Sequence, residues 1–472
     1  MKEVQFFELS SDTNTILNAC SFEYCGIDRL ILASRNQLLS LGSESGKFSL
    51  QELPLEGVPE DSEITSLAAF ADKTTLPVIA VGLTQPSFVV PNYSPTDFSS
   101  KMESSSQGRD HKLFIYSSQP QSYLEAMDLS NITQVRPQSI DIGFTPLRMM
   151  YCQSFMMDMA SLAVTGSDST IHFFKQNVLE CRPPIPREYS IGSAVESVPR
   201  FAASEDESVY SEEEGYSEDD ITSSESGHLS ESPGGVTDES ADRRRSSLFE
   251  MFPVPVFGFD SITSPILSLD SMIGSSSVQF FAGGCENGDV VVTAKRGEES
   301  YVFTRKFQGP ISCVEFVGDN HLVVGGTLGF AAVMKVDLDD NASLRVHEPV
   351  LLPGSTEHDA VLCSAVSDVD WDGEQEVLIG TYGEQLLAYS RVREGGALSS
   401  IGGSDSEYVL DWTREFAHPI YSIKTGDFNQ DGAEELVVNT LRGVHILQPD
   451  LQAAAKSILV AVENLEQLKQ IM

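Results

Sequence analysis

The amino-acid sequence predicts an all-β fold, a seven-bladed β-propeller with a C-terminal amphipathic α-helix and a long disordered acidic insert. Pairs of short apolar runs, joined by Gly, Ser or Asn turns, occur seven times along the chain. The small residue that ends the first run of each pair recurs about every 40–60 residues where no long insert intervenes, which is typical of propeller blades. A β-sandwich or two separate sheet domains is the alternative, and seven similar pairs disfavour it.

Each pair consists of two runs rich in β-branched residues and leucine, the composition of short strands. The first runs occupy residues 30–34, 78–82, 162–166, 280–284, 322–326, 377–381 and 436–440, and the second runs occupy residues 37–41, 112–116, 170–174, 289–293, 330–334, 385–389 and 444–447. The aligned small residues are Ser34, Gly82, Gly166, Gly284, Gly326, Thr381 and Thr440. We interpret the first runs as inner strands, because small residues suit the crowded centre of a propeller, where backbones approach closely.

Composition divides the chain into four parts. Residues 1–181 are predicted to form blades 1–3, with a polar loop at 92–110, and residues 248–449 are predicted to form blades 4–7. Between them lies a predicted disordered insert, residues 182–247, and a predicted helix, residues 450–472, ends the chain. The insert is rich in serine and carries fourteen acidic residues between positions 201 and 242, where Lys and Arg are absent. Such a segment cannot bury enough apolar surface to offset the entropy of ordering it.

The insert ends in a basic cluster, Arg243-Arg244-Arg245-Ser246-Ser247. This pattern fits a basophilic kinase substrate twice, with Ser246 or Ser247 as the acceptor. A phosphate there would lie beside three arginines and could order the segment through charge-assisted hydrogen bonds. A short solvated charge run is the alternative reading of the cluster.

The charge balance excludes several classes of partner. The chain has 70 acidic and 30 basic residues and a formal net charge of −40. Binding to a nucleic-acid backbone or to anionic lipid needs clustered Lys and Arg, so neither partner is expected. The N-terminus lacks the apolar region of a signal peptide, and no apolar run approaches the ~20 residues of a membrane span, so no direct membrane insertion is expected. Seven scattered cysteines without a Cys-x-x-Cys pair indicate reduced thiols in a cytoplasmic protein.

Two acidic loops, each directly before a predicted strand, have the spacing of calcium ligands. Side-chain oxygens occur at positions 1, 3, 5 and 9 and Gly at position 6 of each loop, as in loops that wrap around one calcium ion. The candidate ligands are Asp368, Asp370, Asp372 and Glu376 in the first loop and Asp427, Asn429, Asp431 and Glu435 in the second. Position 12 is Ile379 or Val438, so these are not EF-hands, and their place in a hairpin is that of the FG-GAP repeats of integrin-alpha propellers. The alternative is that the Asp side chains cap backbone N–H groups without a metal.

Catalytic chemistry has little support in the sequence. The eight His residues lack the spacing of metal ligands, and neither a Gly-x-Ser-x-Gly elbow nor a phosphate-binding loop is present. We therefore expect a protein that is not an enzyme and needs no cofactor, with Ca²⁺ as the one ion that the motifs support.

The hydrophobic period changes to that of a helix after residue 450. The apolar residues then step by four and three, and Ala, Lys, Glu and Gln fill the other positions. The stripe is formed by Leu451, Ala455, Ile458, Val462 and Leu465. Either the helix packs on its own propeller or it is a contact for a partner protein.

The last third of the chain resembles the kaptin family. The resemblance is most specific between residues 349 and 452, and its motifs are residues 351–355, 359–364, 368–373, 381–387 and 443–448. Residues 309–312 and 144–146 are also similar to this family. The acidic insert is longer than the family pattern, so nothing is carried over to it.

The resemblance implies a non-enzymatic scaffold role in the KICSTOR complex. That complex holds the GATOR complex at lysosomes and restrains TOR kinase signalling when amino acids or glucose are scarce. The implied partners are an integrin-alpha-like FG-GAP propeller protein, the other KICSTOR subunits and the GATOR complex, and the implied location is the periphery of the lysosomal membrane. The family is also associated with F-actin, so the alternative is an actin-filament-binding cytoskeletal protein in actin-rich projections.

Overall fold

The structure is a computed structural model whose described residues all belong to one unit, Met1–Pro186 with Ser247–Met472. The described residues are 1–9, 18–24, 26–44, 46–71, 77–86, 109–117, 128–152, 161–176, 249–252, 259, 262–274, 278–297, 299–318, 320–338, 343–392, 408–449, 455–456 and 459. The predicted insert, residues 182–247, and the polar loop 92–108 therefore lie outside the described residues. No helix within the described ranges is long and apolar enough to cross a membrane.

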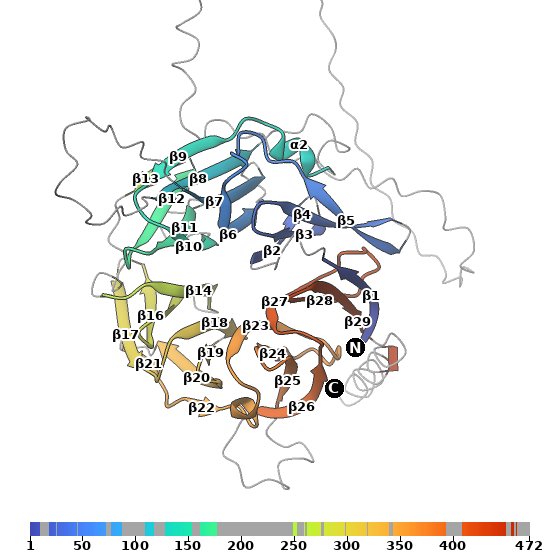
Figure 1. The fold of residues 1–472 in the computed structure, drawn as a ribbon. Coiled ribbons are helices and arrows are strands. Elements are labelled where there is room, and N and C mark those ends of the chain that lie inside the picture. Colours follow the sequence, from blue (N-terminus) through green and yellow to red (C-terminus); the bar gives the residue numbers. More distant parts are fainter. Residues whose placement is uncertain are drawn as a thin grey trace, which may run out of the picture. The chain divides into compact units, whose positions relative to one another are not determined.

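Seven antiparallel sheets are arranged in a ring, which confirms the predicted seven-bladed β-propeller (Figure 1). Blade 1 contains β2 (Asn18–Tyr24), β3 (Ile27–Ala33), β4 (Leu38–Glu44) and β5 (Lys47–Leu53). Blade 2 contains β6 (Glu63–Phe70), β7 (Val78–Pro86), β8 (Arg109–Ser117) and β9 (Gln138–Ile142). Blade 3 contains β10 (Pro146–Cys152), β11 (Ser161–Gly166), β12 (Ile171–Gln176) and β13 (Phe249–Phe252). A short helix, α2 (Ser130–Thr133), precedes β9.

The second half of the ring repeats this plan. Blade 4 contains β14 (Ile266–Ile273), β15 (Gln279–Cys285), β16 (Asp289–Arg296) and β17 (Glu299–Lys306). Blade 5 contains β18 (Ile311–Val317), β19 (His321–Gly326), β20 (Phe330–Leu338) and β21 (Leu344–Val346), and β22 (Val350–Leu351) also pairs with β20. Blade 6 contains β23 (Val361–Ser367), β24 (Glu376–Thr381), β25 (Gln385–Arg391) and β26 (Tyr408–Glu415), and the 3₁₀-helix η2 (Ser355–Glu357) precedes it. Blade 7 contains β27 (Ile420–Gly426), β28 (Glu435–Thr440), β29 (Gly443–Gln448) and β1 (Lys2–Glu8).

The ring is closed by the two ends of the chain. Strand β1 pairs antiparallel with β29 and so supplies the outermost strand of blade 7. An ion pair of 2.9 Å between Arg414 Nη2 and Glu3 Oε2 joins the same strand to blade 6. The sequence pattern predicts that the N-terminal residues belong to blades 1–3, and the sheet order instead places β1 in blade 7.

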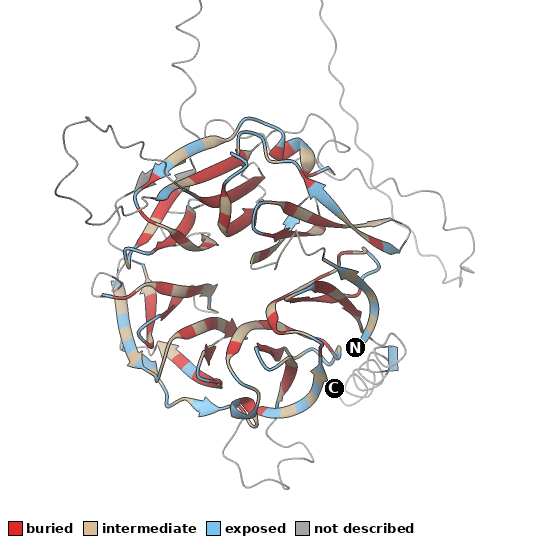
Figure 2. Ribbon diagram, viewed as in Figure 1, coloured by how far each residue is buried: buried red, intermediate tan, exposed pale blue. Residues whose placement is uncertain are grey.

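The core is divided among the interfaces between blades. Seven clusters of buried apolar side chains occupy the seven interfaces between neighbouring blades, and each cluster draws on two of them. Strands β19 and β24 are buried at every position, because the second strand of a blade is covered on both faces (Figure 2). The outer strands β17 and β26 alternate between buried or half-buried and exposed positions along most of their length. Burying one large aliphatic side chain stabilises the fold by about 1.5–3 kcal/mol, so the clusters hold the ring together.

The apolar runs of the sequence are the second and third strands of each blade, and not the inner strands. The strands nearest the axis are β2, β6, β10, β14, β18, β23 and β27, and each contacts the corresponding strand of the next blade. Their residues are more polar, because one edge of each strand borders the central channel. The aligned small residues therefore lie on second strands or directly after them.

The sheet order also differs from the predicted boundary between blade 3 and the acidic insert. Strand β13 follows the predicted insert in sequence but pairs with β12 in blade 3. The insert therefore separates the third and fourth strands of blade 3, whereas the sequence analysis placed it between blades 3 and 4. A four-residue outer strand has too short a pattern to be assigned from the sequence.

Candidate functional site

The two predicted calcium loops lie at equivalent places in neighbouring blades. Residues 368–375 connect β23 to β24 in blade 6, and residues 427–434 connect β27 to β28 in blade 7. Each loop has a left-handed residue at position 4, Trp371 or Gln430, and a left-handed glycine at position 6, Gly373 or Gly432. The sequence pattern therefore produces the same sharp turn twice.

The aspartates of the first loop accept hydrogen bonds from the loop backbone. Asp368 accepts from the N–H groups of Asp372 and Gly373 at 3.1 and 2.9 Å. Asp370 Oδ1 accepts from Asp372 N at 3.1 Å, and Asp372 Oδ1 accepts from Glu374 N at 2.8 Å. This is the capping arrangement that the sequence left open as the alternative to calcium.

The second loop repeats these contacts. Asp427 accepts from the N–H groups of Asp431 and Gly432 at 3.0 and 2.9 Å, and Asn429 Oδ1 accepts from Asp431 N at 2.8 Å. Asp431 Oδ1 accepts from Ala433 N at 2.9 Å, and Asn429 Nδ2 donates to Asp431 Oδ2.

A buried glutamate lies at the base of each loop. Glu376 accepts from Val369 N at 2.9 Å, and Glu435 accepts from Phe428 N at 2.9 Å. Burial, followed by the neighbouring aspartates, raises the pKa of Glu376 to about 8. Burial also raises the pKa of Glu435 to about 7.

Six of the eight predicted ligands are brought together. One oxygen each from Asp368, Asp370 and Glu376 lie within 4.8 Å of one another, and the same holds for Asp427, Asp431 and Glu435. Asp372 lies outside the first group and Asn429 is bonded to Asp431 in the second. Calcium prefers sites formed by oxygen ligands alone, so the ligand atoms of these residues suit calcium. Binding of calcium in the two loops stays a prediction.

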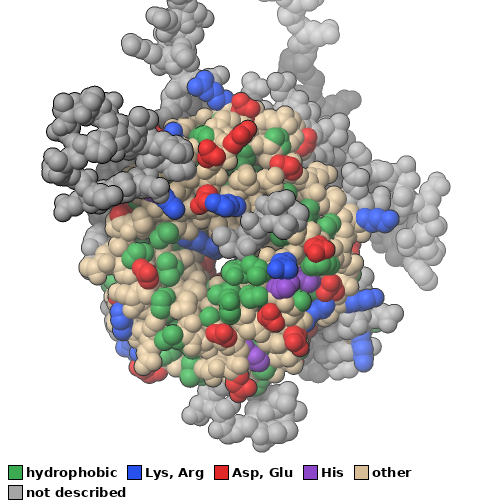
Figure 3. All heavy atoms as spheres, in the orientation of Figure 1, with side chains coloured by type: hydrophobic (Ala, Val, Ile, Leu, Met, Phe, Trp, Pro, Cys, Tyr) green, Lys and Arg blue, Asp and Glu red, His purple; other side chains and the backbone are tan. Residues whose placement is uncertain are grey.

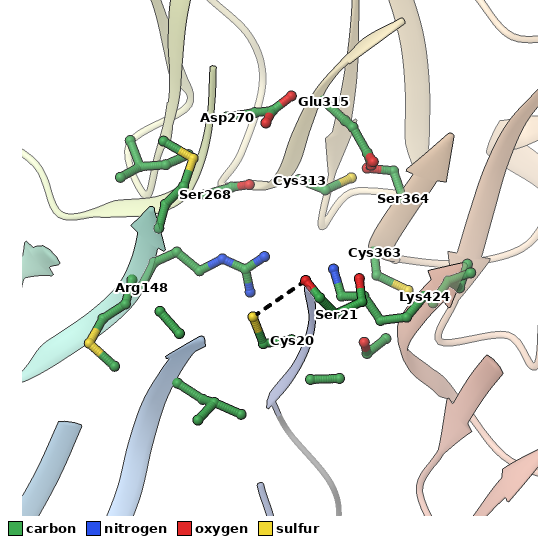
Figure 4. A pocket seen from close by; sticks show the side chains of 18 of the residues that line it. Cys20, Ser21, Arg148, Ser268, Asp270, Cys313, Glu315, Cys363, Ser364 and Lys424 are labelled. Carbon is green, nitrogen blue, oxygen red and sulfur yellow. Dashed lines mark hydrogen bonds between the residues drawn. The ribbon is translucent and has the colours of Figure 1, made fainter. Parts of the chain in front are cut away.

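A second cluster of polar side chains lines the central channel, and no sequence motif predicts it. The channel contains a cavity of about 480 Å³ that all seven inner strands line. Its charged side chains are Glu23 from β2, Arg148 from β10, Asp270 from β14, Glu315 from β18 and Lys424 from β27, and Figure 4 labels the last four. These residues come from five blades, and no short motif connects them, so sequence spacing could not bring them together.

Strand register places the channel residues at two levels. Each inner strand of blades 2–7 carries a register shift near its first residue, as in the pairings of β10, β14, β18 and β27. Asp270, Glu315 and Lys424 each lie four residues after the residue at which the register shift of their strand begins. They therefore share one level of the channel. Arg148 is two residues after it, at the level of Ser268.

The buried carboxylates Asp270 and Glu315 have hydrogen-bond donors. Asp270 Oδ2 accepts from Phe316 N at 2.7 Å, and Glu315 Oε2 accepts from Ser364 Oγ at 2.7 Å. The inner edge of a blade has unpaired N–H groups, and Asp270 satisfies one of them on the next blade. Burial and then the charge of Glu315 raise the pKa of Asp270 to about 7, and burial raises the pKa of Glu315.

Other side chains of the inner strands join neighbouring blades in the same way. Cys20 Sγ accepts from Ala69 N at 3.2 Å, Ser268 Oγ accepts from Val314 N at 3.1 Å, and Ser312 Oγ donates to Val361 O at 2.6 Å. Burial raises the pKa of the thiols of Cys313 and Cys363, so both are protonated at neutral pH. The described cysteines are free thiols: Cys20, Cys152, Cys285, Cys313 and Cys363.

The remaining predicted sites fall mostly outside the described residues. Ser246 and Ser247 lie outside them, as do Leu451, Ile458, Val462 and Leu465. Ala455, Lys456 and Leu459 are described, have helical backbone and are exposed, but no helix bounds are defined there. Both the kinase sites and the partner helix therefore remain predictions.

Comparison with known proteins finds a family match over the last part of the chain. Residues 318–459 match the model of a family described as KICSTOR complex protein kaptin. A protein of Mus musculus named KICSTOR complex protein kaptin is 34% identical over 218 residues, which cover 43% of this chain and 49% of that protein. The match thus spans about half the length of the curated relative.

Two solved structures are similar over most of the chain. They are crystal structures of BBS1N in complex with ARL6DN, one soaked with mercury and the other with lead. The first has a TM-score of 0.48 and 10% identity and covers 95% of this chain and 97% of that chain. The second has a TM-score of 0.47 and 10% identity and covers 94% and 95%.

Proposed function

We propose that this chain, whose residues 318–459 match the kaptin family, is a non-enzymatic interaction subunit of a KICSTOR-type complex. The observation that carries the proposal is the family match, which extends from just before β19 through blades 6 and 7 and past β29. The propeller supports it, because a ring of blades presents broad, rigid surfaces to partner proteins. The partners that follow are the other KICSTOR subunits, among them an integrin-alpha-like FG-GAP propeller protein.

The cellular role follows from the complex. We propose that the chain helps to hold the GATOR complex at lysosomes and so to restrain TOR kinase signalling under amino-acid or glucose limitation. This proposed cellular role is supported by the family resemblance alone. Its attachment to the lysosomal membrane would be peripheral, through the complex.

Exposed apolar side chains within the matched region are the proposed partner contact. Leu328 is 66% exposed, Tyr382 is 51% exposed and Leu351 is 57% exposed. Leu328 and Tyr382 occupy the turns between second and third strands of blades 5 and 6, so the common topology places them at the same end of neighbouring blades. On the face shown in Figure 3, hydrophobic side chains gather near the middle, over the area of β18, β23 and β27 in Figure 1. Large exposed apolar side chains that occur together are typical of protein-binding surfaces.

The test is a native pulldown of tagged full-length chain with mass spectrometry of the bound proteins. We expect wild type to recover the other KICSTOR subunits. The double variant Leu328→Asp with Tyr382→Asp should recover at least about tenfold less of them. Val302→Asp is the matched control, because Val302 is 45% exposed on β17, outside the matched region. Equal recovery by both variants would refute the proposed surface. Failure of wild type to recover any KICSTOR subunit, with direct cosedimentation of the purified chain with F-actin, would refute the proposed function in favour of the cytoskeletal alternative.

The C-terminal stripe is proposed as a second partner contact. Of the described residues there, Leu459 is 63% exposed. Ile458→Asp with Val462→Asp is expected to abolish partner binding while the purified chain melts like wild type. Leu378→Ala, at a fully buried position of β24, is the control for damage to the core. If the double variant is as destabilised as Leu378→Ala, the stripe packs on its own propeller and is not the contact.

A further inference from the structure

The central channel contains two cationic groups that act on the wall carboxylates through space: both lower the pKa of Glu315, and Lys424 also lowers the pKa of Asp270. The guanidinium of Arg148 and the ammonium of Lys424 form no hydrogen bond or ion pair with any described residue. Only the backbone N–H of Arg148 is bonded, to Thr165 Oγ1. Asp270 and Glu315, by contrast, accept hydrogen bonds from Phe316 and Ser364. Among the lining residues, the two cationic side chains therefore lack a direct hydrogen-bond partner in the described part of the chain, and so does the exposed carboxylate of Glu23.

Both cations reach the same space. Arg148 comes from blade 3 and Lys424 from blade 7, on either side of blades 1 and 2, and both side chains point into the cavity (Figure 4). Each of them lowers the pKa of Cys20, which burial otherwise raises, so both charges act on one point of the channel wall. Two cations that meet in one cavity are notable in a chain with 30 basic and 70 acidic residues.

We propose that the channel binds a small-molecule anion, a carboxylate or a phosphate, held between Arg148 and Lys424. The planar guanidinium offers two parallel N–H donors that match a carboxylate or phosphate, and the ammonium adds a point charge. The cavity volume of about 480 Å³ lies within the range of small-molecule sites. Hydroxyls of the wall, such as Ser21 and Ser422, supply further donors close to the charges.

A purely structural role is the competing account. In it, Arg148 and Lys424 only balance the charges of Asp270 and Glu315 across the channel. That role requires no ligand, and it predicts that anions stabilise the chain no more than other salts do. The two accounts therefore differ in a direct binding measurement.

The experiment uses the purified full-length chain, so it does not rest on the proposed function. Inorganic phosphate and succinate are titrated separately by calorimetry and by thermal melting, at constant ionic strength set with NaCl. Succinamide is the neutral analogue of succinate, and 1,4-diaminobutane is the cationic control. We expect saturable binding and a rise in melting temperature with phosphate, succinate or both, and neither effect with succinamide or 1,4-diaminobutane. Preference between phosphate and succinate distinguishes the two classes of anion.

Absence of saturable binding by either anion overturns the proposal.

Variants locate the site. Arg148→Gln and Lys424→Gln are each expected to weaken binding about tenfold or more, because each removes a charge-assisted hydrogen bond. Lys424→Arg should retain binding. Lys306→Gln, which changes a cation on the outer strand β17, is the matched control and should bind like wild type. If the channel variants bind as tightly as Lys306→Gln, the site holds an adventitious ion only and the proposal is wrong. Should a channel variant fail to fold, the comparison of succinate with succinamide on wild type still decides between the accounts.

Discussion

Asp270 shows how one residue can connect two blades and also make stability depend on pH. Its carboxylate accepts a hydrogen bond from Phe316 N on the neighbouring blade. The pKa of Asp270 is about 7, raised by burial and then by Glu315. The unfolded chain loses this proton near pH 4. Between pH 4 and pH 7 the folded state therefore holds a proton that the unfolded state has lost, so the Asp270 contribution lowers the free energy of unfolding as pH rises.

The first prediction is that Asp270→Asn removes this dependence. Asn can still accept the hydrogen bond from Phe316 N but carries no charge. The stability of the variant relative to wild type should rise by on the order of 2–4 kcal/mol between pH 4 and pH 7 and then level off. Urea unfolding at several pH values measures it. Asp141→Asn, at an exposed position of β9, is the control and should give a flat difference. A flat difference for Asp270→Asn as well would show that its carboxyl is ionised in the folded state.

The side chains of the acidic loops can either cap backbone N–H groups or bind calcium. We propose that both loops bind calcium, because clustered carboxylates around a buried glutamate repel one another without a cation. The prediction is that millimolar calcium raises the melting temperature of wild type and that a chelator lowers it. Asp370→Asn should reduce the calcium response while it keeps the acceptor for Asp372 N. Identical melting curves in calcium and in chelator would favour capping alone.

At the scale of the strand, close packing between blades explains the glycines Gly284 and Gly380 on two second strands. A Cβ added to Gly284 on β15 would meet Ile311 Cγ2, at the start of the next inner strand, at 2.5 Å. A Cβ added to Gly380 on β24 would meet Ile420 Cγ2 at 2.7 Å and Cys363 Sγ at 2.6 Å. The first residue of each following blade thus packs against a position where a side chain does not fit.

This packing predicts a cost for Gly380→Ala. The added methyl group must displace Ile420 or Cys363, which should destabilise the chain by about 1–3 kcal/mol in denaturant unfolding. Gly143→Ala is the matched control, since no atom lies within 4 Å of its added Cβ, and it should change stability by less than about 0.5 kcal/mol. Equal effects of the two substitutions would mean that the blade interface yields to the extra volume.

The same strands show how far the sequence predicts this fold. The second and third strands are buried on both faces, so they appear as apolar runs, and seven such pairs were enough to predict seven blades. Inner strands such as β14 and β27 mix apolar and polar residues because one edge borders the channel, so they were missed. Of the candidate sites, the acidic loops were found because their ligands are close in sequence. Arg148, Asp270 and Lys424 were not found, because only ring closure brings them together.

For the whole molecule, stability depends on how the ring is closed. Strand β1 pairs along its length with β29, and Leu9 N donates to Arg442 O at 2.9 Å. Deletion of residues 1–9 should therefore lower the melting temperature by more than about 5 °C, because it exposes the edge of blade 7 and removes the ion pair to Arg414. Thermal melting of the purified truncated chain measures this.

Deletion of residues 186–246, unlike deletion of residues 1–9, should change the melting temperature little. All described strand pairs and all seven apolar clusters lie outside this segment. The melting temperature should fall by less than about 5 °C, since a shorter connection between β12 and β13 costs little loop entropy. A larger fall would show that the acidic segment contributes contacts to the folded chain.

The pairing of β1 with β29 also fixes the order of events during synthesis. Strand β1 leaves the ribosome before the other described strands, and its partner is more than 430 residues later in the chain. At translation rates of about 5–20 residues per second, β1 waits roughly 20–90 s with an unpaired edge. Lys2 and Glu8 place charges at its two ends, which disfavour pairing with another nascent chain. Completion of the ring therefore waits for the synthesis of β29, and chains that stall before β29 would display an open blade to the cell's quality-control machinery.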